Sequence, residues 1–241
     1  MVDSITFAVG DVHGCFDKLE SLIAACDLLS EGKNARFVFI GDYVDRGPDT
    51  RKVIDFLIES QIREPDRFIC LRGNHEAMLI NAADKDRSDR DLMDWWANGG
   101  EQTLDSYGVN DPGALPAHHL AWMKVLPLTF TDRKRLYVHA GIRPGVPIAE
   151  QSEKDLLWIR EPFLSCADNH GALVVHGHTP TKSGLPDLRS NRLNLDTGAC
   201  FGRPLTAALF TPAQSAPSLY CNSGGNFWEP DGSGPTSLRS S

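Results

Sequence analysis

The sequence predicts an α/β (α+β) protein in which two β-sheet layers form a sandwich flanked by helices. Three observations predict it: strand–loop–helix units fill the first eighty residues, a polar helical segment follows, and short strands dominate after Pro127. Successive strand–loop–helix units predict parallel strands with covered faces. The later strands, the first two of which flank a polar turn, predict a second, more antiparallel sheet.

The three opening units share one pattern, in which an apolar strand ends in a Gly- and Asp- or Asn-rich loop and a helix follows. The expected strands are Ile5–Val9, Arg36–Ile40 and Phe68–Leu71, and the expected helices cover Asp17–Leu29, start at Pro48 and cover His75–Ala83. Proline suits the first turn of a helix. In such sheets, ligand sites lie beyond the carboxyl ends of the strands. The loops GDVHG, GDYVDRG and GNHE all follow strands in this way.

The remaining chain is expected to complete a single domain over residues 1–221. Residues 84–125 are polar and then helical, and they form a candidate helical cap subdomain whose tryptophans are expected to pack. The later strands are expected at Leu128–Thr131, Arg135–Val138, Leu173–Val175, Leu193–Leu195, Thr206–Phe210 and Ser218–Tyr220. Residues 222–241 are rich in Gly, Ser and Pro, which predicts a flexible tail.

Composition and net charge disfavour some classes of partner and environment. The 241 residues are 41% hydrophobic and 23% charged, which is typical of a globular protein. A net charge of −8 argues against partners such as nucleic acid or anionic membranes, which attract basic surfaces. Six scattered cysteines without a CxxC pair predict reduced thiols. We expect a cytoplasmic protein, because the sequence shows neither a signal peptide nor an apolar stretch of about 20 residues.

Polar side chains of metal-binding type recur at the expected strand ends. They are Asp11, His13, Asp42, Asn74, His139 and His178. Each is ambiguous alone, because Asp beside Gly often forms a turn and a lone His is usually structural. Their joint occurrence favours a centre for two divalent cations. This mixture of carboxylate, amide and imidazole suits Mn, with Fe or Zn as alternatives, better than Mg or Ca. Asp42 can bridge two cations about 3.5–4 Å apart, which could hold a hydroxide for in-line attack.

The motifs GD-x-HG, GD-x-x-DRG, GNHE, HAG and GHT together resemble the phosphoprotein phosphatase family of calcineurin-like metallophosphoesterases, in its compact bacterial and phage lambda form. The similarity covers roughly residues 5–210. It implies the metallophosphoesterase fold, with Asp11, His13 and Asp42 on one metal and Asp42, Asn74, His139 and His178 on the other. It also implies that His75 is the general acid oriented by Asp45, and that Arg46 and, in LLWIRE, Arg160 bind phosphate.

Elementary chemistry agrees with these roles. A planar guanidinium can bind two phosphoryl oxygens at once. The alkoxide that leaves a phosphoserine needs a proton, which an imidazole can supply near neutral pH. A carboxylate on the other ring nitrogen would fix the tautomer and favour the charged ring.

Three functions remain open. The favoured one is a serine/threonine, or dual-specificity, protein phosphatase that acts on phosphoproteins or small phosphoesters. The alternative is a diadenosine tetraphosphatase-like nucleotide hydrolase, and the least favoured is a non-catalytic scaffold. Asp45 favours the phosphatase, because symmetrical diadenosine tetraphosphatases resemble GDLVARG in this loop, with Ala at that position. GDVHG and HAGIRPG, however, also resemble the hydrolases. The sequence leaves the oligomeric state and the role of Arg143 open, and His176 is expected to be structural.

Overall fold

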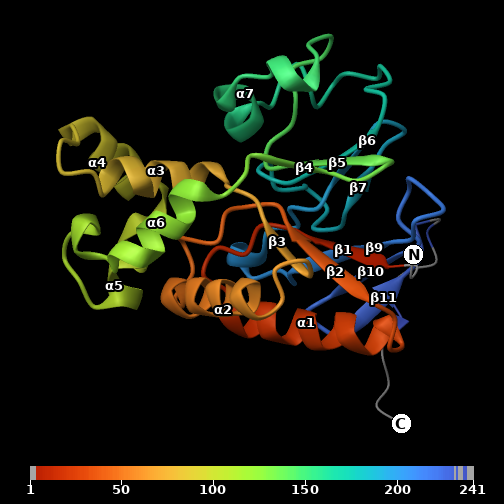
Figure 1. Ribbon diagram of the computed structural model, residues 1–241, viewed down its shortest axis with the longest axis horizontal. Helices are drawn as coiled ribbons and strands as arrows, with labels where there is room; N and C mark the ends of the chain where they lie inside the picture. The colour runs from red at the N-terminus through yellow and green to blue at the C-terminus, as the bar shows by residue number, and fades with distance from the viewer. Residues whose placement is uncertain (1–3, 231, 233–235, 238–241) are drawn as a thin grey trace.

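Two β-sheets pack face to face with helices on their outer sides in the computed structural model, which describes residues 4–230, 232 and 236–237 (Figure 1). The first sheet has the strand order β12-β11-β10-β9-β1-β2-β3 within these residues. Its strands are β1 (Ile5–Val9), β2 (Ala35–Phe39), β3 (Phe68–Cys70), β9 (Thr206–Phe210), β10 (Leu219–Asn222), β11 (Asn226–Trp228) and β12 (Thr236–Ser237).

The opening units fold as predicted. β1 pairs in parallel with β2, and β2 with β3. The connecting helices are α1 (Phe16–Ser30) and α2 (Thr50–Arg63), which lie together on one face of the sheet (Figure 1). Apolar side chains on the inner faces of both helices, including Leu22 and Ile54, are fully buried.

The prediction that the strands at 206–210 and 218–220 belong to the second sheet is wrong. β9 pairs antiparallel with β1, and β10 pairs with β9, so both extend the first sheet. β2 takes only one edge of β1, and the buried N–H and C=O groups on its other edge need partners. β9 supplies them, and small residues such as Ala208 opposite Ala8 fit between the two sheets.

The second sheet has a parallel centre, so the expectation of a more antiparallel sheet is wrong there. Its order is β4-β5-β6-β8-β7, with β5, β6 and β8 parallel and β4 and β7 antiparallel at the edges. Its strands are β4 (Thr129–Thr131), β5 (Arg135–Val138), β6 (Leu173–His176), β7 (Asp187–Leu188) and β8 (Arg192–Asn194). The segments 139–172 and 177–191 are long enough for the crossovers that parallel pairing requires.

The predicted tail is also wrong in part. Asn226–Trp228 form β11, which pairs antiparallel with β10. The indole of Trp228 is buried against Tyr220, 5.6 Å between ring centroids, and this apolar contact stabilises the extra strand. Residues 231, 233–235 and 238–241 lie outside the described residues.

Residues 84–125 are helical, as predicted, and pack beside α2 and α3 (Asn74–Ala82) (Figure 1). This region contains α4 (Asp89–Trp95), the π-helix η1 (Trp96–Gly100), α5 (Glu101–Tyr107), the 3₁₀ helix η2 (Pro112–Ala114) and α6 (Ala117–Val125). Further along lie η3 (Ile148–Glu150), α7 (Glu153–Trp158) and η4 (Ala199–Phe201). Among the described helices, none is long and apolar enough to cross a membrane.

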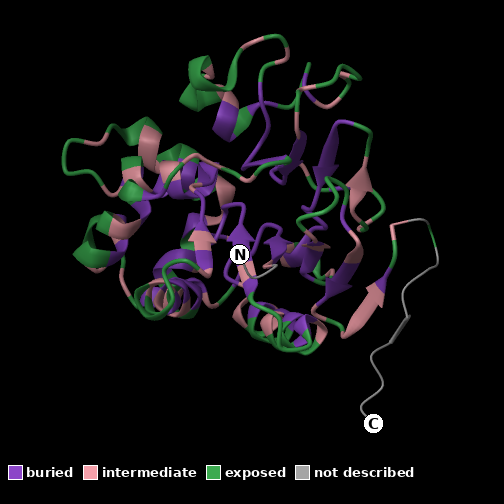
Figure 2. Cartoon of the chain, turned by 45° about the vertical axis from the view of Figure 1, so that its right-hand side comes forward, coloured by how far each residue is buried: buried purple, intermediate pink, exposed green. Residues whose placement is uncertain are grey.

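Buried side chains concentrate in the strands and on the helix faces turned toward them (Figure 2). One apolar cluster lies between the sheets, and a larger one lies between the first sheet and the helices. A third packs the outer face of the second sheet against α7 and the segment after it. All six cysteines are free thiols, as predicted. The two sheets therefore form a rigid support whose loops after β1, β2, β3, β5 and β6 carry the polar side chains.

Candidate metal centre

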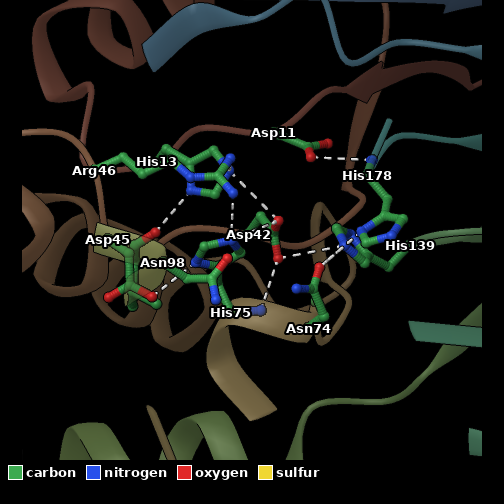
Figure 3. A network of polar contacts seen from close by, with 12 residues as sticks. Asp11, His13, Asp42, Asp45, Arg46, Asn74, His75, Asn98, His139 and His178 are labelled. Atoms are coloured by element: carbon green, nitrogen blue, oxygen red, sulfur yellow. Dashed lines mark hydrogen bonds and ion pairs between the residues drawn. The ribbon is translucent and has the colours of Figure 1, made fainter. Parts of the chain in front are cut away.

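The structure brings the predicted ligands from five separate loops to one place (Figure 3). The carboxyl ends of β1, β2 and β3 meet those of β5 and β6 there. Two groups of side chains have atoms within 4.8 Å of one another, namely His13, Asp42 and His75, and Asp42, His139 and His178. Both groups share Asp42.

Asp42 lies between the two groups and uses a different oxygen toward each. Its Oδ2 is 3.4 Å from His13 Nε2, and its Oδ1 is 3.3 Å from His139 Nε2. Burial alone would raise the pKa of Asp42, but the neighbouring histidines, His139 foremost, lower it well below its usual range. An ionised carboxylate with two separately directed oxygens is what a bridge between two cations requires.

The histidine rings present lone pairs rather than N–H groups to this space. His13 Nδ1 donates to the Val44 carbonyl at 2.8 Å, and His139 Nδ1 donates to the Ile40 carbonyl at 2.9 Å. In a neutral ring, each Nε2 is then an acceptor. That of His13 accepts from Arg46, while that of His139 faces oxygen atoms that are also acceptors. His139 Nε2 lies 2.8 Å from Asn74 Oδ1. Acceptors that face one another in this way fit a cation between them.

The electrostatics of the rings agree with that fit. Burial lowers the pKa of His13 to about 3, and burial together with His139 lowers the pKa of His178 to about 3. Neutral imidazole is the form that binds a metal. His178 Nδ1 is 2.9 Å from Asn74 Oδ1, so the amide oxygen faces both histidines of the second group.

Asp11 lies at the edge of the site rather than inside either group. Its Oδ2 accepts the His178 backbone N–H at 3.0 Å, while its Oδ1 is buried without a hydrogen-bond partner among the described residues. Burial, with Asp196 and Asp42 nearby, raises the pKa of Asp11 well above its ordinary value. A buried carboxylate oxygen without a donor is costly unless a cation compensates it.

His75 and Asp45 form a buried pair beside the first group. His75 Nδ1 donates to Asp45 Oδ2 at 2.8 Å, and both side chains are at most 1% exposed. Burial would lower the pKa of His75, but Asp42 and Asp45 outweigh it and raise the pKa above its ordinary value. The ring therefore has a fixed orientation, with Nε2 directed toward Asp42 Oδ2 at 3.9 Å.

Two residues that the sequence did not single out for function hold Asp45. Its Oδ1 accepts the Trp95 indole N–H at 2.9 Å and the Thr103 hydroxyl at 2.8 Å. Trp95 was expected to pack, and it is fully buried, but it also serves as a donor. No local pattern marks this role, because Trp95 comes from the helical segment about fifty positions beyond Asp45.

Glu76 organises the loop that carries Asp42. Its two carboxylate oxygens accept the backbone N–H groups of Asp42, Tyr43, Val44 and Gly73 at 2.7–3.2 Å. Burial and the nearby Asp42 raise the pKa of Glu76 to about 7 despite these four donors. The last residue of GNHE is therefore a structural support, which ties the loop after β2 to the start of α3.

Both predicted phosphate-binding arginines lie near the centre but in different surroundings. Arg46 donates to His13 Nε2 and His75 Nε2, both at 2.8 Å, and its guanidinium lies over the Phe201 ring. Arg160 is exposed and lines a pocket that reaches His178. Arg46 belongs to the loop after β2, and Arg160 to the segment after α7.

Backbone strain is concentrated at this site. Of the six non-glycine residues with left-handed φ in the described chain, five belong to it, namely His13, Asp42, Asp45, Arg46 and His178. Such conformations cost about 1–3 kcal/mol each and persist where function requires them. Glycine is also required here: a Cβ on Gly73 would lie 2.2 Å from Asp42 Oδ1, and one on Gly177 would lie 2.0 Å from Asp11 Oδ1.

Two further residues lie near the site: His176, which was expected to be structural, and Asp196, which the sequence analysis did not name. His176 is buried with its ring 5.0 Å from that of Phe163, a structural position as expected. Sequence reasoning missed Asp196, which lies two residues beyond the end of β8 and two residues before Gly198, without the preceding glycine of Asp11 and Asp42. Burial raises the pKa of Asp196 to about 6, and its charge acts on Asp11.

Comparisons with known proteins agree with this geometry. A model of the family described as calcineurin-like phosphoesterase matches residues 6–208. The chain is 29% identical over 215 residues to a serine/threonine-protein phosphatase 1 of Salmonella typhimurium, covering 84% of this chain and 90% of that protein. It is also 29% identical over 230 residues to an asymmetrical bis(5'-nucleosyl)-tetraphosphatase PrpE of Bacillus cereus, covering 82% of this chain and 87% of that protein.

Among solved structures, the fold resembles that of a putative diadenosine tetraphosphatase, with a TM-score of 0.64 and 20% sequence identity. The likeness covers 88% of this chain and 95% of the other. At this identity it supports the fold alone. The relatives with similar overall identity carry names for two different substrates, so the substrate must be argued from the site.

Proposed function

Since this chain belongs to the calcineurin-like phosphoesterase family, we propose that it is a metal-dependent phosphatase that hydrolyses phosphomonoesters. Its favoured substrates are phosphorylated serine and threonine side chains of proteins, with phosphotyrosine as a further class to test. The observation that carries this proposal is the buried contact between His75 and Asp45.

The side chains around Asp42 are proposed to hold two divalent cations, manganese in the first instance, with His75 left as the proton donor rather than a ligand. Asp11, His13 and Asp42 would hold one, and Asp42, Asn74, His139 and His178 the other. When bound, such cations supply Lewis acids that lower the pKa of water and draw charge from phosphoryl oxygens. The unpartnered Asp11 Oδ1 and the facing acceptors at Asn74 and His139 support this set.

The chain's own residues bind the phosphoryl group and supply a proton. Arg46 and Arg160 belong to different segments, after β2 and after α7, and each guanidinium can bind phosphoryl oxygens through paired N–H groups. Arg46 now donates to His75 Nε2, which requires an unprotonated Nε2. When Arg46 turns to a phosphoryl oxygen, that nitrogen is free to carry the proton that the leaving oxygen needs.

The leaving group explains why this pair favours the phosphatase. A serine alkoxide is a poor leaving group and needs a proton, whereas a nucleotide phosphate leaves more easily. Asp45 raises the proton affinity of His75 and fixes its tautomer, and Trp95 and Thr103 hold Asp45 in turn. Three buried groups thus position one imidazole. This arrangement suits a leaving group that needs a proton.

A nucleotide hydrolase is the second candidate. Its support is the similarity to proteins named asymmetrical bis(5'-nucleosyl)-tetraphosphatase over more than four fifths of this chain. Those proteins act on substrates with several linked phosphates, so the same centre would face a longer anionic chain.

One comparison separates the two candidates. The specificity constant kcat/KM is measured for the manganese-loaded protein on a phosphoserine peptide and on diadenosine tetraphosphate. The phosphatase proposal expects the peptide to be preferred. A large preference for the dinucleotide would replace it with the second candidate.

A further inference from the structure

The pocket that Arg160 lines opens directly beside the centre. Its volume is about 370 Å³, and we call it the Trp158 pocket. It is lined by Arg143, Lys154, Asp155, Trp158, Ile159, Arg160, Glu161 and His178. His178 connects it to the metal-binding side chains, and the indole of Trp158 stands 6.0 Å from that imidazole, ring centroid to ring centroid.

The carboxylates of this pocket are already engaged. Asp155 accepts two hydrogen bonds from the Arg143 guanidinium at 2.6 and 2.9 Å and one from the Ser152 hydroxyl at 2.8 Å. Glu161 accepts from Ser165 at 2.5 Å. Neither carboxylate neutralises the other two cations that line the pocket.

Those two cations are Lys154 and Arg160. Within the described residues, neither side chain makes an ion pair or a hydrogen bond, and both are exposed. Glu153, the neighbour of Lys154, pairs instead with Arg72 at 2.8 Å. The pocket thus keeps uncompensated positive charge in a chain whose net charge is −8.

The indole of Trp158 strengthens the attraction between this positive charge and a bound anion. Trp158 is 42% exposed and forms an apolar wall next to the cations, which excludes part of the water around a bound group. Attraction between opposite charges grows as the effective dielectric constant falls. The wall and the cations together suit a substrate that carries a second negative charge.

We propose that the Trp158 pocket binds a second anionic group of the substrate, an acidic side chain of a phosphopeptide adjacent to the scissile phosphate. This inference rests on the proposed phosphatase function. Arg160 would contact the scissile phosphate, while Lys154 contacts the neighbouring carboxylate with Arg143 behind it. The same chemistry would accept the next phosphate of a polyphosphate, and the experiment separates the two sources.

The test uses two peptides that carry one phosphoserine and differ only in having Glu or Gln at the two positions on each side. The ratio of kcat/KM for the Glu peptide to kcat/KM for the Gln peptide is measured for the manganese-loaded protein, for Lys154→Gln and for Lys33→Gln. Lys33 is a matched control, because it is exposed and lies before β2, at the end of the sheet opposite the centre.

The wild-type ratio should be roughly five, and Lys154→Gln should lower it roughly threefold through KM. Lys33→Gln should leave the ratio at its wild-type value. A higher salt concentration should reduce the ratio, because salt screens the attraction between charges. The net charge of −8 alone would disfavour the Glu peptide, so a ratio above one points to the local cations. A ratio that Lys154→Gln leaves unchanged, or that Lys33→Gln lowers equally, would overturn the inference.

Failure of the phosphatase proposal would look different. In that case both peptides are poor substrates for every variant, while diadenosine tetraphosphate is hydrolysed. Lys154→Gln is then compared on diadenosine tetraphosphate and on p-nitrophenyl phosphate, which has a single phosphate. A loss confined to the dinucleotide keeps the anion-binding pocket with a polyphosphate as its ligand. An equal loss on both substrates overturns it.

Discussion

His75 Nδ1 lies 2.8 Å from Asp45 Oδ2 in a fully buried contact beside the side chains grouped around Asp42. Two different parts of the chain meet there. The loop after β2 supplies Asp45, and the helical segment supplies the donors Trp95 and Thr103. Residues 84–125 therefore act on the site through Asp45, whether or not they also cover it.

Replacing His75 tests its role as proton donor. His75→Asn should lower turnover of a phosphoserine peptide by roughly 10²–10⁴, because general acid catalysis contributes about that much. The metal content of the variant should equal that of the wild type, since Asp42, Asn74 and His139 remain. Loss of bound metal would instead assign His75 as a ligand, a position that its closeness to His13 and Asp42 also permits. Unchanged turnover would remove it from the mechanism.

Trp95→Phe tests the support behind Asp45. The change keeps an aromatic ring in the core but removes the indole donor, so kcat should fall roughly tenfold as Asp45 and His75 lose their alignment. Stability should fall by about 1 kcal/mol, measured by urea unfolding. Trp96→Phe is the matched control, because Trp96 is the next residue but is 47% exposed. Equal losses of kcat in both variants would mean that the Trp95 contact has no special role.

Glu76→Gln tests the loop support. The glutamine keeps one acceptor oxygen and replaces the other with an NH₂ group, which leaves two of the four backbone N–H donors unpaired. The free energy of unfolding should fall by about 2–5 kcal/mol. Calorimetry of the metal-free variant measures this directly. A loss below the error of the measurement would show that water replaces the carboxylate at no cost.

His119 should make the protein less stable in mild acid. Its Nδ1 accepts the Tyr107 hydroxyl at 2.7 Å, and its Nε2 lies 3.0 Å from Asp55 Oδ1, which favours the charged ring but is outweighed by burial. Burial, helped by His118, lowers the pKa of His119 below its ordinary 6.5. Below that pH, the unfolded chain binds a proton that the folded ring does not, so the free energy of unfolding falls as pH falls.

The measurement for His119 is urea unfolding in chelator between pH 7.5 and 5.5, roughly the window around the ordinary histidine pKa. His119→Gln should show a shallower fall in stability with acid than the wild type. His118→Gln, at the exposed neighbouring ring, should keep most of the wild-type slope. An unaltered slope in His119→Gln would contradict the lowered pKa.

Much of the fold could be predicted because its first half is built from local patterns. β1 matches the expected Ile5–Val9, and α1 extends the expected helix by one residue at each end. The strands at 206–210 and 218–220 belong to the first sheet rather than the expected second one, because a short apolar run does not specify its partner. Pairing of β9 with β1 depends on a free strand edge some two hundred residues away, which no local pattern records.

The candidate site was likewise predictable only in part. Ligand candidates could be predicted because each follows its own strand, and parallel strands bring their ends together. The supports could not, since Trp95 and Thr103 reach Asp45 from another element through long-range packing. Asp196 carries a weaker signal, because it lies two residues after β8 and has no glycine before it. Together with burial, its negative charge raises the pKa of Asp11.

Catalysis by this chain is proposed to need two cations on the side chains around Asp42. The direct measurement is the rate of p-nitrophenyl phosphate hydrolysis by chelator-treated protein as manganese is added back. We predict a negligible rate without metal and a maximum at about two ions per chain. A full rate in the presence of chelator would contradict the account.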